Sequence, residues 1–110
     1  MDRKLAQYRE IALSIINEYA GFKPSQGNIE LQAISDRDFY LLISFGWNGD
    51  RRVHNTILHL RIQRGKFWIE RDETEEGVTQ DLLDRGVSKE DIVLAFYHPE
   101  HRKITEFAIA

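Results

Sequence analysis

The chain has 110 residues, 42% of them hydrophobic, and a formal net charge of −3 at pH 7. This length predicts a single domain over residues 1–110, with one core that buries roughly two-thirds of the unfolded surface. The sequence has no cysteine, which excludes disulfides, thiolate metal sites and cysteine nucleophiles and fits a protein of the reducing cytoplasm. The negative charge argues against a free-standing nucleic-acid binder, and the longest apolar run, Ile92 to Tyr97, is far shorter than the roughly 20 residues that span a bilayer.

The first twenty residues have the pattern of an amphipathic helix. Asp2 is suited to cap this helix and Gly21 to end it. Between them, apolar residues recur at spacings of three and four and share one side: Leu5, Tyr8, Ile11, Ala12, Ile15, Ile16 and Tyr19. This stripe predicts that the helix packs on a sheet, which we expect after a loop at residues 21–28.

Strand patterns follow the loop. Asn48-Gly49 and Arg64-Gly65 are typical two-residue turns, and Asp36 to Asp38 form a further turn. These turns separate four predicted strands, at residues 29–35, 39–47, 51–63 and 66–71. We therefore expect these strands to form an antiparallel meander.

Beyond the meander, the chain favours short elements. They are a helix from Thr74 or Glu75 to Gly86, a turn with a capping box of Ser88 and Asp91, a buried strand at 92–96, and a last helical turn from Pro99. The predicted fold class is therefore α+β: an antiparallel sheet of four strands or slightly more, with the N-terminal helix on one face and short C-terminal helices.

The turn at Arg64-Gly65 has a readable register. With these two residues as the loop, Arg61 faces Trp68, Leu60 faces Ile69 and His59 faces Glu70. Alternation then divides the side chains into two faces. The core face carries Leu58, Leu60, Ile62, Phe67 and Ile69, and the other face carries His59, Arg61, Trp68, Glu70 and Asp72.

The turn at Asn48-Gly49 extends the core face into the preceding strand. With these two residues as the loop, that face continues through the odd-numbered residues Phe39, Leu41, Ile43 and Phe45. Bringing residues 29, 31 and 33 onto the same face requires a three-residue loop or a bulge at Asp36 to Asp38. The opposite face then keeps a candidate interaction surface that needs a cover from later helices, a second subunit or a partner: Tyr40, Leu42, Val53, Ile57, Trp68, His59, Arg61 and Glu70.

Charge is unevenly distributed along the chain. Residues 51–71 hold six basic residues and one acidic residue, a net +5, and residues 72–91 hold eight acidic and two basic residues, a net −6. The favoured interpretation is a solvated, self-compensating surface. The alternative is a basic surface that approaches DNA or an acidic partner, with Arg51, Arg52, Arg64 and Lys66 as candidates.

No complete catalytic set is evident. His59 opposite Glu70, with Asp72 nearby, has the elements of a base oriented by a carboxylate, but a structural cross-strand pair is favoured. His98 and His101 lack a third metal ligand at a diagnostic spacing. We expect no catalytic residue, no metal and no cofactor.

Long stretches of the sequence nevertheless resemble the XisI family, the excision controlling factors of the fdxN DNA element in cyanobacteria. The resemblance covers nearly all of the chain: residues 2–20, residues 46–78 and residues 86–110. Its most specific parts are Lys66-Phe67-Trp68-Ile69, the segment 89–96 (KEDIVLAF), and Thr105-Glu106-Phe107-Ala108.

The resemblance implies a non-enzymatic accessory factor for DNA recombination, the programmed excision of a DNA element during heterocyst differentiation. It implies two partners: a companion controlling factor of the XisH type, which has a nuclease-like fold, and a site-specific recombinase. We further expect a homo-oligomer whose contact with DNA is weak or indirect. The alternatives are a nuclease subunit that uses His59, Glu70 and Asp72, and a direct DNA-binding protein that uses the basic hairpin at 51–71.

Overall fold

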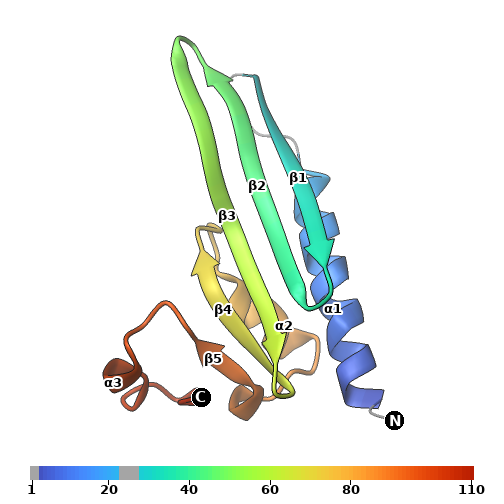
Figure 1. Ribbon diagram of the computed structural model, residues 1–110, viewed down its shortest axis with the longest axis vertical. Coiled ribbons are helices and arrows are strands. Elements are labelled where there is room, and N and C mark those ends of the chain that lie inside the picture. The colour runs from blue at the N-terminus through green and yellow to red at the C-terminus, as the bar shows by residue number, and fades with distance from the viewer. Residues whose placement is uncertain (1–2, 23–27) are drawn as a thin grey trace.

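A five-stranded sheet forms the centre of the computed structural model, which describes residues 3–22 and 28–110 (Figure 1). The first four strands form the predicted antiparallel meander, and the fifth pairs in parallel with the fourth. Their bounds are β1 (Asn28–Asp36), β2 (Phe39–Asn48), β3 (Arg51–Gln63), β4 (Lys66–Asp72) and β5 (Ile92–Leu94). The predicted α+β class is confirmed, and the parallel β5 makes the sheet mixed.

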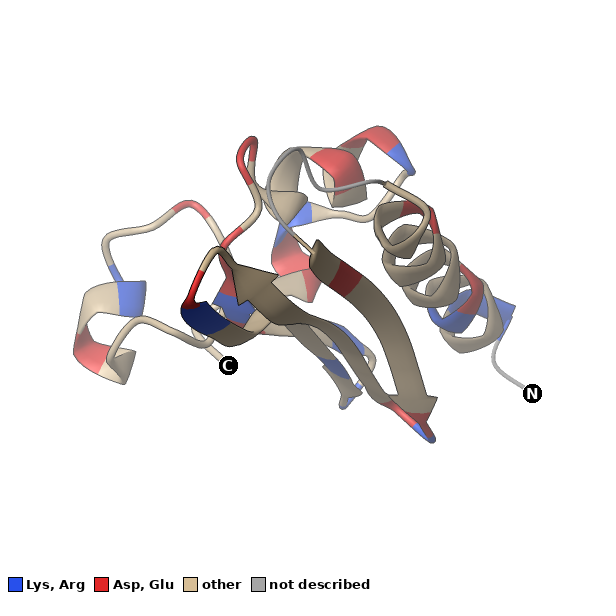
Figure 2. Ribbon diagram, turned by 90° about the horizontal axis from the view of Figure 1, so that it is seen from above, with Lys and Arg blue, Asp and Glu red and all other residues tan. Residues whose placement is uncertain are grey.

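Two helices pack on one face of this sheet, which we call the helix face. They are α1 (Arg3–Ala20) and α2 (Val78–Asp84) (Figures 1 and 2). The apolar stripe of α1 is buried as predicted, through Tyr8, Ala12, Ile15 and Ile16. The proposed cap at Asp2 and most of the loop after Gly21 lie outside the described residues.

The C-terminal part holds a short 3-10 helix, η1 (Lys89–Asp91), and α3 (Pro99–Arg102), which begins at the predicted proline. Ser88 precedes η1 but makes no capping hydrogen bond through its side chain, so the predicted capping box does not form. No helix among residues 3–22 and 28–110 combines the length and the apolar character needed to cross a bilayer.

Helix α2 begins later than predicted. The Asp72 carboxylate accepts a hydrogen bond from the Val78 amide at 2.7 Å and another from the Thr74 amide at 3.0 Å. This carboxylate therefore organises residues 73–77 as a turn and satisfies an amide that would be unpaired at the start of the helix. Residues 74 and 75 precede the helix for this reason.

The hairpin of β3 and β4 has the predicted register over most of its length. Arg64 and Gly65 both have positive φ, 56° and 74°, as a type I′ turn requires. Arg61 lies opposite Trp68, and Leu60 lies opposite Ile69. The predicted core residues of this hairpin are all buried: Leu58, Leu60, Ile62, Phe67 and Ile69.

The turn between β2 and β3 differs from the prediction by one residue. Asn48 pairs with Arg51, so Gly49 and Asp50 form the loop. Gly49 has a φ of 67°, which fits the first loop position of a type II′ turn, where glycine is favoured. The shift moves each cross-strand partner by two positions and therefore leaves the faces unchanged.

A β-bulge at Ile57 does change the faces. Thr56 lies opposite Ile43 and Leu58 lies opposite Leu42, so Ile57 is an extra residue in β3. Beyond the bulge, the even-numbered residues of β2 share a face with Leu58 and Leu60. Tyr40 and Leu42 are consequently buried beneath α1, with exposed fractions of 2% and 1%, whereas we expected them on the opposite face.

The inverted face of β2 also determines which side chains of β1 reach the core. The connection of β1 to β2 is a two-residue loop, Arg37-Asp38, and not the predicted three-residue loop. An even loop places Leu31 opposite Ser44 and Ala33 opposite Leu42. Both residues therefore reach the core face as predicted, since the inverted face of β2 compensates for the different loop length.

A buried carboxylate ties the two ends of the chain together. Asp91 accepts a hydrogen bond from the Tyr8 hydroxyl at 2.7 Å and forms an ion pair with the Lys4 ammonium at 2.5 Å. Burial opposes ionisation of Asp91, but the hydrogen bonds from Lys4 and Tyr8 outweigh it, so the pKa of this carboxyl lies below its usual range. Burial and the bond to Asp91 raise the pKa of Tyr8 to about 12.

We predict that Asp91→Asn lowers the free energy of unfolding by about 1–3 kcal/mol, because the substitution removes a buried charge-assisted hydrogen bond and ion pair. Since the pKa of Asp91 is depressed by folding, its contribution is present above the unfolded pKa of about 3.9 and is lost as pH falls through the lower folded pKa. Urea unfolding followed by circular dichroism measures both effects. Glu90→Gln, at the exposed neighbour, is the control; equal destabilisation by both variants would contradict the assignment.

Candidate functional site

The face of β1, β2 and β3 opposite the helices is not covered by any other element of the described chain (Figure 1). We call it the open face. Its centre is an apolar row along β2, formed by Phe39, Leu41, Ile43, Phe45 and Trp47. Phe39 and Trp47, at the two ends of the row, remain about half exposed, at 48% and 49%. Aromatic surface of this extent is typical of an interaction site.

The two flanking rows of the open face carry opposite charge. On β1, the row consists of Asn28, Glu30, Gln32, Ile34 and Asp36; we call it the acidic row. On β3, it consists of Arg52, His54, Thr56, His59 and Arg61; we call it the basic row. The apolar row therefore lies between carboxylates on one side and guanidinium and imidazole groups on the other.

The predicted interaction surface is thus corrected. Tyr40 and Leu42 belong to the core, and Val53 and Ile57 also lie on the helix face, because of the bulge in β3. The odd-numbered residues of β2 replace them on the open face. The four remaining predicted residues, His59, Arg61, Trp68 and Glu70, do lie on the side away from the helices.

Arg61 links several of these groups. Its guanidinium lies 3.3 Å from the Glu70 carboxylate and within 6.0 Å of the rings of Phe39 and Trp68. Arg102 approaches Trp68 at 5.7 Å from the C-terminal segment. No sequence pattern predicts this last contact, because α3 has no periodicity that fixes where it docks.

The candidate set of His59, Glu70 and Asp72 is not assembled. A second register shift, next to His59, places Arg71 and not Glu70 opposite His59, and it places Asp72 opposite the buried Leu58. Asp72 is therefore on the helix face, where it organises the start of α2. Among the described residues the Nε2 atom of His59 is buried without a hydrogen-bond partner, and burial lowers the pKa of this histidine, an effect that Glu70 opposes and Arg61 reinforces.

The predicted basic surface is divided. Arg51 and Arg52 lie beside the turn at one end of β3, and Arg64 and Lys66 flank the turn at the other end. The twelve residue steps from Arg52 to Arg64 correspond to roughly 40 Å along the strand. Lys66 also donates a hydrogen bond to the Ala110 carbonyl at 2.6 Å. The basic residues of this hairpin therefore do not form one patch.

His98 and His101 lie near each other, with ring centroids 6.1 Å apart. The Nδ1 atom of His98 accepts a hydrogen bond from the Glu100 amide and thereby caps α3. Within residues 3–22 and 28–110, no group of three or more histidine or carboxylate side chains is placed to hold a metal ion.

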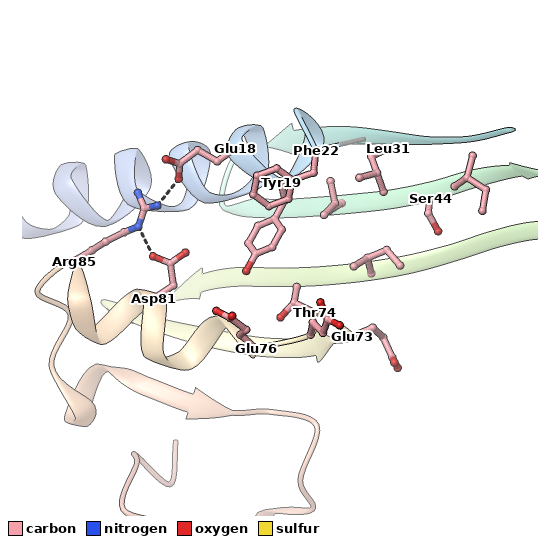
Figure 3. A pocket seen from close by; sticks show the side chains of 14 residues that line it. Glu18, Tyr19, Phe22, Leu31, Ser44, Glu73, Thr74, Glu76, Asp81 and Arg85 are labelled. Carbon is pink, nitrogen blue, oxygen red and sulfur yellow. Dashed lines mark hydrogen bonds and ion pairs between the residues drawn. The ribbon is translucent and has the colours of Figure 1, made fainter. Parts of the chain in front are cut away.

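A groove of about 880 Å³ opens on the helix face, between the end of α1, the strands β1 to β3 and the segment before α2 (Figure 3). Apolar side chains such as Leu31, Leu42 and Ile57 form its floor. Its rim carries Arg85 and the carboxylates of Glu18, Glu73, Glu75, Glu76 and Asp81. The acidic run at residues 73–76 was expected to begin a helix, and in the structure it borders this groove instead.

Arg85 closes one end of the groove. It forms ion pairs with Asp81, at 2.7 Å, and with Glu18 of α1 (Figure 3). These pairs tie α2 to α1 across the rim. An apolar group bound in the groove would lie beside the Arg85 guanidinium. The open face, by contrast, offers a longer and flatter surface.

Comparison with known proteins gives one family. The sequence model described as XisI protein matches residues 1–109. A solved XisI-like protein from Anabaena variabilis ATCC 29413 has 31% identity to this chain and a TM-score of 0.88, with 96% of this chain and 99% of that chain covered. No curated protein matches the sequence.

A second solved structure, the fdxN element excision controlling factor XisI from the same organism, has 41% identity and a TM-score of 0.77. The alignment covers 97% of this chain and 99% of that one. The sequence resemblance and the structural likeness therefore extend over the same, nearly complete length.

Two adjacent residues test the assignment of faces. We predict that Leu42→Glu lowers the free energy of unfolding by more than about 3 kcal/mol, because it buries a carboxylate in the core. Ile43→Glu, one residue away on the open face, should change the free energy of unfolding of the monomer by no more than about 1 kcal/mol. Urea titrations monitored by circular dichroism compare the two, and similar losses would show that the faces are wrongly assigned.

Proposed function

Because the chain belongs to the XisI family, we propose that it is a controlling factor for the excision of a DNA element of the fdxN type. The observation that carries this proposal is the 41% identity, over 97% of the chain, to a protein described as an fdxN element excision controlling factor. The process is a DNA rearrangement of cyanobacterial heterocyst differentiation, and the protein acts in the cytoplasm.

The proposed role is accessory and not catalytic. The two carboxylates that a nuclease would need are already engaged in structural contacts, which supports this role. Asp72 organises the start of α2, and Glu70 is paired with Arg61. The protein acts through two partners, a companion controlling factor of the XisH type with a nuclease-like fold and a site-specific recombinase. The acid-rimmed groove on the helix face provides surface for such contacts.

Contact with DNA is weak or indirect in this proposal. Phosphate binding requires several cations that act together, because each neutralised phosphate contributes separately to the salt-dependent affinity. The groups at the two ends of β3 are roughly 40 Å apart. At the β2–β3 turn Arg52 also lies 5.5 Å from the ring of Trp47, which orients its guanidinium toward the aromatic surface of the open face.

A reconstituted excision assay tests the proposed role. A reporter interrupted by an fdxN-type element is expressed with the recombinase, the companion factor and this chain. We predict excision only when all three proteins are present, and loss of excision when this chain is omitted. Excision at an unchanged rate without it would overturn the proposal.

The same cells test the partnership. An affinity tag on this chain should retain the companion factor, while a Leu42→Glu variant, whose fold we expect to be lost, serves as the negative control. Failure of the intact chain to retain either the companion or the recombinase would remove the proposed mode of action.

A second prediction concerns catalysis. The purified protein should not cleave plasmid DNA in the presence of magnesium or manganese, because no acid, base and metal-ligand set is assembled among the described residues. Gel electrophoresis of supercoiled plasmid measures this directly. Cleavage by the wild type that disappears in Glu70→Ala would instead identify a nuclease.

A further inference from the structure

We propose that the open face is the interface of a homodimer, in which two copies stack their sheets face to face about a two-fold axis that runs along β2. This inference concerns the assembly of the chain and does not depend on the proposed role in excision. It rests on the size of the open face and on the arrangement of its charges.

The size of the open face suits such an interface. The apolar row from Phe39 to Trp47 is roughly 27 Å long, and the three strands make the face roughly 15 Å wide. The flat area is therefore roughly 400 Å² per copy, before the relief of the side chains is counted, and a standard interface buries roughly 800 Å² of accessible surface from each partner. The C-terminal segment limits the face on the β4 side, where Arg102 lies over Trp68.

The charges determine how two copies fit. A two-fold axis along β2 places the acidic row of one copy over the basic row of the other and brings the two apolar rows together. A two-fold axis across the strands would instead place the two basic rows on each other, at a cost in like-charge repulsion. Only the first arrangement makes the face complementary to itself, as an isologous interface requires.

The register shows which groups come together. Asp36 and Arg61 both lie at the level of Phe39, and Glu30 and His54 both lie at the level of Phe45. In the dimer, Asp36 of one copy therefore approaches Arg61 of the other, and Glu30 approaches His54. Packed sheets are commonly rotated by about 30°, so the match is between rows and not between single atoms.

The axis makes a specific prediction for cross-linking. Each residue of the apolar row lies close to the same residue of the second copy, because the axis runs along that row. Since the natural chain has no cysteine, Ile43→Cys introduces a single thiol. We expect a short bis-maleimide reagent to convert this variant into a covalent dimer. Gln7→Cys, exposed on α1, is the matched control and should not form a covalent dimer.

Charge reversal tests the pairing of the rows. Glu30→Arg should raise the dimer dissociation constant about tenfold or more, because it places a cation over the basic row. Adding Arg52→Glu to this variant should restore much of the affinity, since the two rows become complementary again. Glu10→Arg makes the same change in charge on the exposed side of α1 and should have no effect. Sedimentation velocity measures the constants, and circular dichroism verifies that each variant is folded.

Each alternative gives a different result. A protein that stays monomeric at micromolar concentration overturns the proposal, and so does burial of the open face by the companion factor alone. If Glu30→Arg strengthens the dimer, the axis runs across the strands and the proposed arrangement is wrong. A dimer that resists cross-linking at Ile43→Cys uses another surface, such as the free edge of β1, and also refutes it.

Discussion

One extra residue in β3 decides which side of this protein is inside. The bulge at Ile57 reverses the alternation of β3, so that Leu58 and Leu60 share a face with Tyr40 and Leu42 and not with the odd-numbered residues of β2. The bulge is held by the end of the next strand: the Glu73 amide donates to the Ile57 carbonyl at 2.7 Å, and the Arg71 guanidinium donates to the Thr56 carbonyl at 2.9 Å. These bonds satisfy carbonyl groups that the disrupted ladder leaves unpaired. The core, the groove and the open face all depend on this local irregularity.

The sequence predicts the β3–β4 hairpin well and the face of β2 poorly, for a common physical reason. In the hairpin, only one face is apolar, and the turn at Arg64-Gly65 fixes the register. In β2, residues 39–43 are apolar without interruption, so alternation cannot distinguish the two faces. The bulge that makes the choice depends on bonds from Arg71 and Glu73, which are distant in the sequence and have no local signature. The expected His59–Glu70 pair is wrong for the same reason, because it requires a ladder without irregularity.

The two faces of the sheet have different physical characters. On the helix face, apolar side chains are enclosed by α1 and α2, and the remaining groove has carboxylates at its rim. On the open face, apolar and charged side chains are arranged in parallel rows that follow the strands. A partner bound at one of these faces leaves the other face accessible. The proposed accessory role would use these two faces for recognition.

The contact between Tyr8 and Asp91 joins residues 83 positions apart in the sequence. Helix α1 therefore cannot complete its packing until most of the chain is available, although it is the first element made. A contact between residues so far apart requires the closure of a long loop, and the loss of chain entropy precedes the gain from packing. Such contacts slow folding. During synthesis on the ribosome, α1 can pack on β1, β2 and β3 once these strands have emerged, whereas Tyr8 lacks its partner Asp91 until η1 emerges. The last fifth of the chain thus completes the packing of a domain whose helix and meander are made first.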